Sequence, residues 1–223
     1  MTLTLPAAVL WDMDGTLVDT EPDWIAIERA LVGSCGGTWT DHDSVNLVGS
    51  ALLEAGEYIR VRGNVPMTAE QIVETMVEWM VERLKRSVAW RPGARELLAD
   101  LRANGVPCAL VTMSYRQLAD VVVSALPPES FGATVTGDEV VKGKPHPEPY
   151  LRAARELGVD TSDCVVIEDS TTGARAGLAA AARVVAVPNI VPVDVAGVVT
   201  VPTLAGMDTA RLAAAAYLEI NAT

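Results

Sequence analysis

Short apolar runs of strand length recur along the chain, and helix-like segments separate them. They lie at Ala7–Leu10, Pro107–Thr112, Ala133–Gly137, Cys164–Ile167 and Arg183–Asn189. Such runs, bounded by turn residues, are typical of parallel strands buried on both faces. A further apolar run at Val198–Val201 and a helix near Ala210–Tyr217 follow. This alternation of strand and helix predicts an α/β fold with a parallel sheet.

The pattern becomes helical between residues 20 and 87. Pro22 lies near the start of a helix through Val32, where proline is favourable, and a Gly- and Thr-rich break runs from Gly33 to Asp43. Helical segments follow at Ser50–Ala55 and through apolar residues spaced three and four apart, namely Ile72, Met76, Met80 and Leu84. We therefore expect a core domain made of residues 1–19 and 88–223, with an α-helical domain inserted at residues 20–87.

Composition and charge narrow the class of protein. The chain has 223 residues, is 50% hydrophobic but only 4% aromatic, and carries a net charge of −12. This acidity argues against a nucleic-acid partner and against attraction to anionic membranes, so a phosphate would have to be held by local cations. The cysteines Cys35, Cys108 and Cys164 form no Cys-x-x-Cys motif and read as core residues. With no signal-peptide pattern and no apolar run long enough to span a bilayer, we expect a cytoplasmic protein.

Two acids follow the first apolar run. Asp12 and Asp14 lie two residues apart, directly before Gly15. Ligands of open α/β sheets bind beyond the carboxyl ends of the strands, and carboxylates there suit Mg²⁺, which prefers oxygen ligands. The alternative is a strand that runs into a polar turn, for which Asp-Gly is common.

Polar residues also follow the next two strands. Thr112 ends the second strand before Met113 and Ser114, and its hydroxyl can cap a helix or, beside Asp12, bind a phosphate oxygen together with the Met113 amide. Lys144 lies in a proline-rich loop with Lys142 and His146. We read Lys144 as a cation able to pair with a dianion and Lys142 as a solvated loop residue, whereas the role of His146 stays open.

The fourth strand carries two adjacent acids. Glu168 and Asp169 follow Cys164–Ile167, and a Ser-Thr-Thr-Gly segment then enters a helix of small residues. An acidic turn capped by Ser170 is the simpler interpretation, but it does not account for two carboxylates at a strand end.

Together these four motifs, in this order, resemble those of the haloacid dehalogenase-like superfamily, over about Ala7 to Val187. The resemblance implies a Rossmann-like, doubly wound parallel sheet with a helical cap. It also implies a nucleophile at Asp12, a general acid/base at Asp14 and a phosphoryl-binding hydroxyl at Thr112. Lys144 would neutralise the phosphoryl group, and Mg²⁺ would be held by Asp12, the backbone carbonyl of Asp14, and Asp169. The resemblance makes Asp169 the preferred direct metal ligand, and Glu168 would bind through water or orient its neighbours.

Within this superfamily the chain is most similar to the group of β-phosphoglucomutase, phosphoglycolate phosphatase and the sugar-phosphate phosphatases. The mutase carries a cap histidine about twelve residues after its nucleophile, where this chain has Trp24. It also carries an arginine after a Gly-x-Ser step, whereas the residues after Ser50 are apolar here. The Schiff-base lysine of phosphonoacetaldehyde hydrolase has no counterpart in the cap before Lys85.

The sequence thus favours a Mg²⁺-dependent phosphatase that acts on a small phosphorylated metabolite, such as a sugar or polyol phosphate, through an aspartyl-phosphate. The alternatives are a phosphosugar mutase and a non-catalytic phosphometabolite sensor on the same scaffold. Met113, Ser114, Glu168 and Trp24 are the candidate substrate contacts, and Glu28, Arg60 and Arg62 are further candidate selectors in the cap. A monomer or weak homodimer is expected.

Overall fold

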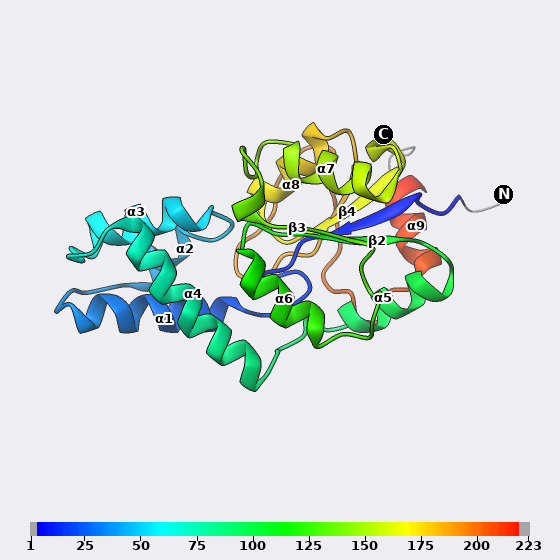
Figure 1. Cartoon of the computed structure of the whole chain (residues 1–223). Coiled ribbons are helices and arrows are strands. Elements are labelled where there is room, and N and C mark those ends of the chain that lie inside the picture. The colour runs from blue at the N-terminus through cyan, green and yellow to red at the C-terminus, as the bar shows by residue number, and fades with distance from the viewer. Residues whose placement is uncertain (1–3, 219–223) are drawn as a thin grey trace.

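A six-stranded parallel sheet forms the centre of the computed structural model, which describes residues 4–218 (Figure 1). The strands are β1 (Ala8–Trp11), β2 (Cys108–Val111), β3 (Ala133–Val135), β4 (Cys164–Glu168), β5 (Arg183–Ala186) and β6 (Val199–Thr200). Their order in the sheet is β3-β2-β1-β4-β5-β6, and every neighbouring pair is parallel. The predicted α/β fold with a doubly wound parallel sheet is confirmed.

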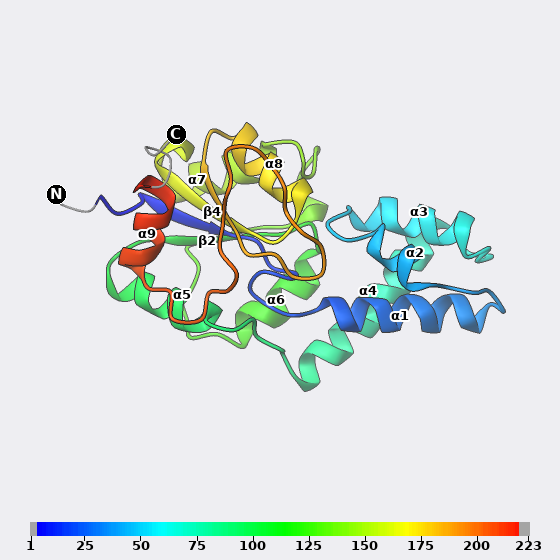
Figure 2. The ribbon, with the colours of Figure 1, turned by 180° about the vertical axis from the view of Figure 1, so that it is seen from behind.

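Helices cover both faces of this sheet, as the views from opposite sides show (Figures 1 and 2). One face carries α5 (Ala94–Ala103), α6 (Arg116–Ser124) and α9 (Thr209–Leu218), and the other carries α7 (Glu148–Leu157) and α8 (Thr171–Ala179). Val9 and Trp11 of β1 pack on the first face, whereas Ala8 and Leu10 pack on the second. Successive strand side chains point to opposite faces, so a strand enclosed on both sides, such as β1, is an apolar run. Two short 3₁₀ helices, Gly137–Glu139 and Thr161–Asp163, complete the core. Between residues 4 and 218, no helix combines the length and the apolar character that crossing a bilayer requires.

The remaining helices gather at one end of the molecule, beyond the carboxyl ends of the strands (Figure 1). They are α1 (Glu21–Ser34), α2 (Asp41–Val45), α3 (Leu52–Arg62) and α4 (Ala69–Arg86). Capping boxes begin two of them: Thr40 with Asp43 starts α2, and Thr68 with Gln71 starts α4. We call this group of helices, residues 21–86, the cap.

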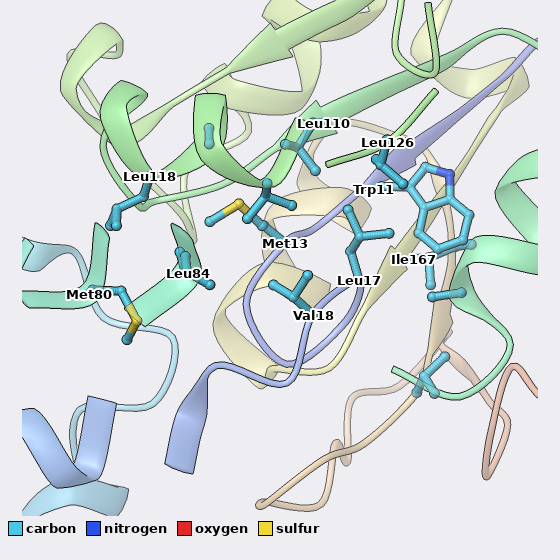
Figure 3. Close-up of a cluster of buried hydrophobic side chains, with 14 of the residues drawn as sticks. Trp11, Met13, Leu17, Val18, Met80, Leu84, Leu110, Leu118, Leu126 and Ile167 are labelled. Atoms are coloured by element: carbon cyan, nitrogen blue, oxygen red, sulfur yellow. The ribbon is translucent and has the colours of Figure 1, made fainter. Parts of the chain in front are cut away.

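The cap and the core share apolar packing at their junction. Met80 and Leu84, on the last turns of α4, lie in one buried cluster with Met13 and Leu118 of the core (Figure 3). The two chain segments that join cap and core run side by side, and the Asp19 amide donates to the Ala89 carbonyl at 2.7 Å. The division of the chain at residues 20 and 87, close to this crossing, stays a proposal.

Some elements differ from the sequence-based expectation. The break expected through Asp43 gives way to α2 at Asp41, because the Thr40 capping box satisfies the free amides of a short helix. The fourth strand extends one residue further than expected, since Glu168 pairs with Ala186 of β5. Glu168 is consequently part of the sheet, and Asp169 is the first residue beyond the strand.

Candidate active site

Asp12 is the first residue beyond β1 and is still held by the neighbouring strand. Its amide donates to the Ile167 carbonyl of β4 at 3.0 Å, which fixes the backbone at the edge of the sheet. Its carboxylate Oδ1 accepts a hydrogen bond from Lys144 Nζ at 2.6 Å. The other oxygen, Oδ2, accepts no hydrogen bond from residues 4–218, and Asp12 lines the pocket described below.

Lys144 is a buried cation between two carboxylates. Its side chain is 3% exposed, and Nζ donates to Asp12 Oδ1 and to Glu168 Oε1, both at 2.6 Å. A third bond goes to the Val111 carbonyl at 2.9 Å. Although burial alone would lower the pKa of Lys144, the charges of Asp12 and Glu168 raise it above its usual range. The ammonium group stays charged and fixes the position of Asp12.

Glu168 lies behind Lys144 and is fully occupied. Oε1 accepts from Lys144 and from the Tyr150 hydroxyl at 2.8 Å, while Oε2 accepts from the amides of Asp169 and Ser170 and from Ser170 Oγ. Its side chain is 1% exposed and does not line the pocket described below. Of the two interpretations of Glu168 given above, the contacts favour that of a group that orients its neighbours.

Asp14 is held by donors from both parts of the molecule. Oδ1 accepts from Thr20 Oγ1 at 2.6 Å and from Trp24 Nε1 at 3.3 Å, and these residues lie at and just inside the cap. Oδ2 accepts from the core residues Ser114 Oγ at 2.8 Å and Thr112 Oγ1 at 3.2 Å. The position of the Asp14 carboxyl group therefore depends on how the cap sits on the core.

The acidic residues at this edge fit a hard divalent cation. Single carboxylate oxygens of Asp12, Glu168 and Asp169 lie within 4.8 Å of one another, and Asp169 Oδ2 is buried with no hydrogen-bond donor within residues 4–218. Burial, and then the neighbouring carboxylates, raise the pKa of Asp169 well above its usual range. Because Glu168 is already occupied, the oxygens left to a metal are those of Asp12 and Asp169. A buried carboxylate oxygen without a donor is unfavourable, and so is a cluster of negative charges. Coordination of Mg²⁺ would relieve both.

Gly15 allows the loop after β1 to lie close to Asp169 at the end of β4. Gly15 has a positive φ of 80°, and a Cβ placed there would lie 2.0 Å from Asp169 Oδ2 and 3.3 Å from Glu21 Oε1. A side chain at residue 15 would thus be both strained and in collision with the acidic cluster. From the sequence alone, Asp14-Gly15 could have been a simple polar turn. In the structure, the glycine leaves the space that the Asp169 carboxylate occupies.

A pocket of about 880 Å³, measured with its open mouth, lies between this edge and the cap. The following sequence-predicted site residues line it: Asp12, Asp14, Trp24, Thr112, Met113, Ser114, Lys144 and Asp169. Glu28 lines it as well. Arg60 and Arg62 do not, because they pair with Glu57 at 2.7 Å and Asp43 at 2.9 Å on the outside of the cap. His146 and Lys142 are exposed in their loop and also lie outside the pocket.

Sequence reasoning assigned no role to several residues that hold this site. Thr20 and Tyr150 donate hydrogen bonds to the key carboxylates, and Asn189 Nδ2 donates to Glu21 and to Asp19. Thr20 lies within the first motif, at a fixed distance from Asp14, and could have been found there. Tyr150 and Asn189 come from separate elements, and nothing in the local sequence marks them.

The chain is similar in sequence to a known family of hydrolases and to individual phosphatases. The family model described as "Hydrolase: haloacid dehalogenase-like hydrolase" matches residues 6–181. The chain is 35% identical to the bifunctional riboflavin kinase/FMN phosphatase of Arabidopsis thaliana over 188 residues, covering 83% of this chain and 49% of that protein. It thus spans about half the length of that relative.

Two further similarities extend over nearly whole proteins. Hexitol phosphatase B of Escherichia coli (strain K12) is 30% identical over 186 residues, or 81% of this chain and 83% of that protein. The crystal structure of CbbY from Rhodobacter sphaeroides in complex with phosphate superposes with a TM-score of 0.81 at 25% identity, covering 93% of this chain and 99% of that one. The match to this structure includes the cap helices as well as the sheet, since so much of both chains is covered.

Proposed function

The chain belongs to the haloacid dehalogenase-like hydrolases and is a phosphatase, and from that premise we propose that it is Mg²⁺-dependent and hydrolyses a small phosphorylated metabolite through an aspartyl-phosphate at Asp12. The observation that carries this proposal is the contact of Lys144 Nζ with Asp12 Oδ1 at 2.6 Å. It occupies Oδ1 and leaves Oδ2 of Asp12 available for attack, in a pocket that Asp14 and Asp169 also line. The phosphatase relatives support the same reaction class.

The first half of the reaction forms the covalent intermediate. Asp12 Oδ2 attacks the phosphorus atom, and the bond between phosphorus and the ester oxygen breaks. Asp14 gives its proton to the departing oxygen, which leaves as an alcohol. Thr112 and the Met113 amide are the proposed donors to the phosphoryl oxygens, since both residues line the pocket at the end of β2.

The second half regenerates the enzyme. Asp14, now ionised, takes a proton from a water molecule that attacks the phosphorus of the aspartyl-phosphate. The bond from Asp12 to phosphorus breaks and inorganic phosphate leaves. Thr20 and Trp24 on one oxygen and Ser114 on the other hold the Asp14 carboxyl group in place. The Thr112 hydroxyl, which donates to Asp14 Oδ2 in this structure, turns to the phosphoryl group when substrate binds.

Charge is the main obstacle to the first step, because a carboxylate must approach a phosphate dianion. Asp12 and Asp169 are the residues that would hold Mg²⁺, which supplies positive charge against that repulsion. Lys144 offers a second, permanent cation whose place is fixed by Glu168. Glu168 is accordingly proposed to be a positioning residue, with no contact to the substrate.

The test is phosphate release from a panel of sugar, polyol and nucleotide phosphates, with Mg²⁺ or with EDTA. We expect turnover that requires Mg²⁺, disappears in Asp12→Asn and persists in the control Asp194→Asn, which changes an exposed aspartate outside the pocket. Binding of a phosphorylated ligand without any release would contradict the proposal and favour a sensor. Isomerisation of a sugar phosphate in place of hydrolysis would favour the mutase.

A further inference from the structure

One face of helix α1 leads from the catalytic edge into the cap. Glu21, Trp24, Ile25 and Glu28 all line the pocket, and they are spaced three and four residues apart, as one helical face requires. Trp24 Nε1 lies 3.3 Å from Asp14 Oδ1, so the indole ring begins beside the reacting groups. Because a helix rises about 1.5 Å per residue, Glu28 lies about 6 Å further along the helix axis than Trp24. The two residues thus follow one another along one wall of the pocket, starting beside Asp14.

Glu28 is a buried carboxyl group with one oxygen held and one available. The residue is 5% exposed, and Oε2 accepts from Trp39 Nε1 at 3.0 Å and from Ser44 Oγ at 2.5 Å. Oε1 accepts no hydrogen bond from any residue within 4–218, although Glu28 lines the pocket. These two donors belong to the cap and prevent the side chain from turning away. The pocket therefore contains a fixed acceptor at some distance from the phosphate site.

The charges around the pocket are strongly one-sided. The ionisable residues that line it are Asp12, Asp14, Glu21, Glu28, Asp169 and Lys144. The single lysine among them already donates to Asp12, Glu168 and the Val111 carbonyl. No other cationic side chain lines the pocket within the described part of the chain. A second anionic group on a substrate would therefore have no cationic partner there and would lie near Glu28.

Most of the remaining lining is apolar, although Ser44 and Ser50 of the cap add hydroxyl groups, of which Ser44 Oγ already donates to Glu28. Ile25, Leu52, Met76 and Ile190 contribute to it, together with the indole of Trp24. Such a surface packs well against the C–H groups of a carbon chain, but it offers few donors. The leaving group must then supply the hydrogen-bond donor that Glu28 lacks.

On the basis of the proposed function, we propose that Glu28 accepts a hydrogen bond from a hydroxyl group of the leaving group, and that it selects neutral polyol monophosphates over substrates with a second anionic group. Selection has two physical sources. The hydroxyl donor pairs with Glu28 Oε1, which accepts no hydrogen bond from residues 4–218, whereas an ionised carboxylate or phosphate in the same place adds like-charge repulsion and cannot donate. Sites that bind a substrate hydroxyl in this way reject analogues that lack the donor.

The test compares two substrates of the same carbon number, glucitol 6-phosphate and gluconate 6-phosphate, which differ by a hydroxymethyl or a carboxylate at the far end. We expect the wild-type kcat/KM to favour the neutral substrate by about tenfold or more. In Glu28→Gln the side-chain oxygen can keep Trp39 and Ser44 while the amide donates into the pocket. This variant should lower the preference by about fivefold or more, because a hydrogen bond to a charged group is worth more than 1 kcal/mol.

A matched control separates this effect from a general change of cap charge. Glu78→Gln removes the same charge from an exposed residue of α4 outside the pocket, and it should keep the wild-type preference. Thermal unfolding of both variants checks that the cap remains folded. The wild-type preference needs no variant, so it tests the proposal even if Glu28→Gln unfolds.

Two results would overturn the proposal while the phosphatase activity stands. One is wild-type turnover of gluconate 6-phosphate as fast as that of glucitol 6-phosphate, and the other is an unchanged preference in folded Glu28→Gln. If the wild-type protein releases phosphate from no ester at all, the proposed function itself is wrong, and the selection by Glu28 falls with it.

Discussion

Replacement of Gly173 by alanine tests how tightly Glu168 is held. Gly173 lies on α8 beneath the Glu168 side chain, and a Cβ there would lie 1.6 Å from Oε1 and 1.9 Å from Cδ of Glu168. No atom can remain at such distances. The carboxylate would therefore move away from Lys144 Nζ and the Tyr150 hydroxyl, to which Oε1 is bound at 2.6 and 2.8 Å.

The expected magnitude comes from two opposing effects. Alanine is better than glycine inside a helix by about 1 kcal/mol. Disruption of a buried ion pair costs about 3–5 kcal/mol, because both charges stay buried. We therefore expect Gly173→Ala to lower the free energy of unfolding by about 2–4 kcal/mol, which is about 4–16 °C in Tm for a chain of this length. The kcat/KM should fall as well, since Lys144 loses one of the two carboxylates that position it.

The assay is thermal and urea unfolding of Gly173→Ala beside the control Gly33→Ala. Gly33 lies in helix α1, and a Cβ there would have nothing within 4 Å, so only the gain in helix propensity applies. The control should be slightly more stable than the wild type, by up to about 1 kcal/mol. If Gly173→Ala is as stable as the control, Glu168 is not confined as the structure indicates, and the argument for its positioning role is refuted.

Three further predictions follow from single contacts. Trp24→Phe keeps an aromatic ring but removes the donor to Asp14 Oδ1. We expect kcat to fall about fivefold, which corresponds to the loss of one hydrogen bond. An unchanged kcat would contradict a role of Trp24 in holding Asp14. Burial, and then the charge of Asp14, raise the pKa of Glu21 to about 7. The folded state thus keeps a proton that the unfolded state loses above its own pKa, so the free energy of unfolding should decrease as pH rises from about 5 to about 7. In urea unfolding with EDTA, the free energy of unfolding should decrease less with pH for Glu21→Gln than for the wild type. An equal dependence on pH in both proteins would refute the raised pKa of Glu21. Added Mg²⁺ should raise the Tm of the wild type but much less that of Asp169→Asn, and equal increases would place the metal elsewhere.

Much of the candidate site was predictable because of one geometric rule. The carboxyl ends of parallel strands meet at one edge of a sheet, so residues that follow separate apolar runs must lie together there. Asp12, Thr112 and Asp169 follow β1, β2 and β4, which are neighbours in the sheet, and all three line the same pocket. Lys144 joins them from a loop. Its charge marked it as a possible partner of a dianion, and the family resemblance assigned it to the site.

The parts that could not be predicted depend on register and on helix packing. Glu168 belongs to the sheet because it pairs with Ala186, and no local pattern distinguishes this from a position one residue beyond the strand. In the cap, Glu28 faces the pocket whereas Arg62 pairs with Asp43 outside it. Which face of a cap helix turns inward depends on how the helices pack on one another, and periodicity alone does not determine that.

The central claim is that Asp12 carries the phosphoryl group during turnover, and chemical trapping tests it most directly. Protein quenched in acid during steady-state hydrolysis is treated with borohydride, which reduces an acyl phosphate to an alcohol, and the digest is analysed by mass spectrometry. The account predicts homoserine at position 12, none at positions 14 or 169, and none in protein quenched without substrate. Phosphate release from the wild type with unmodified Asp12, or with the label on another carboxylate, would contradict it.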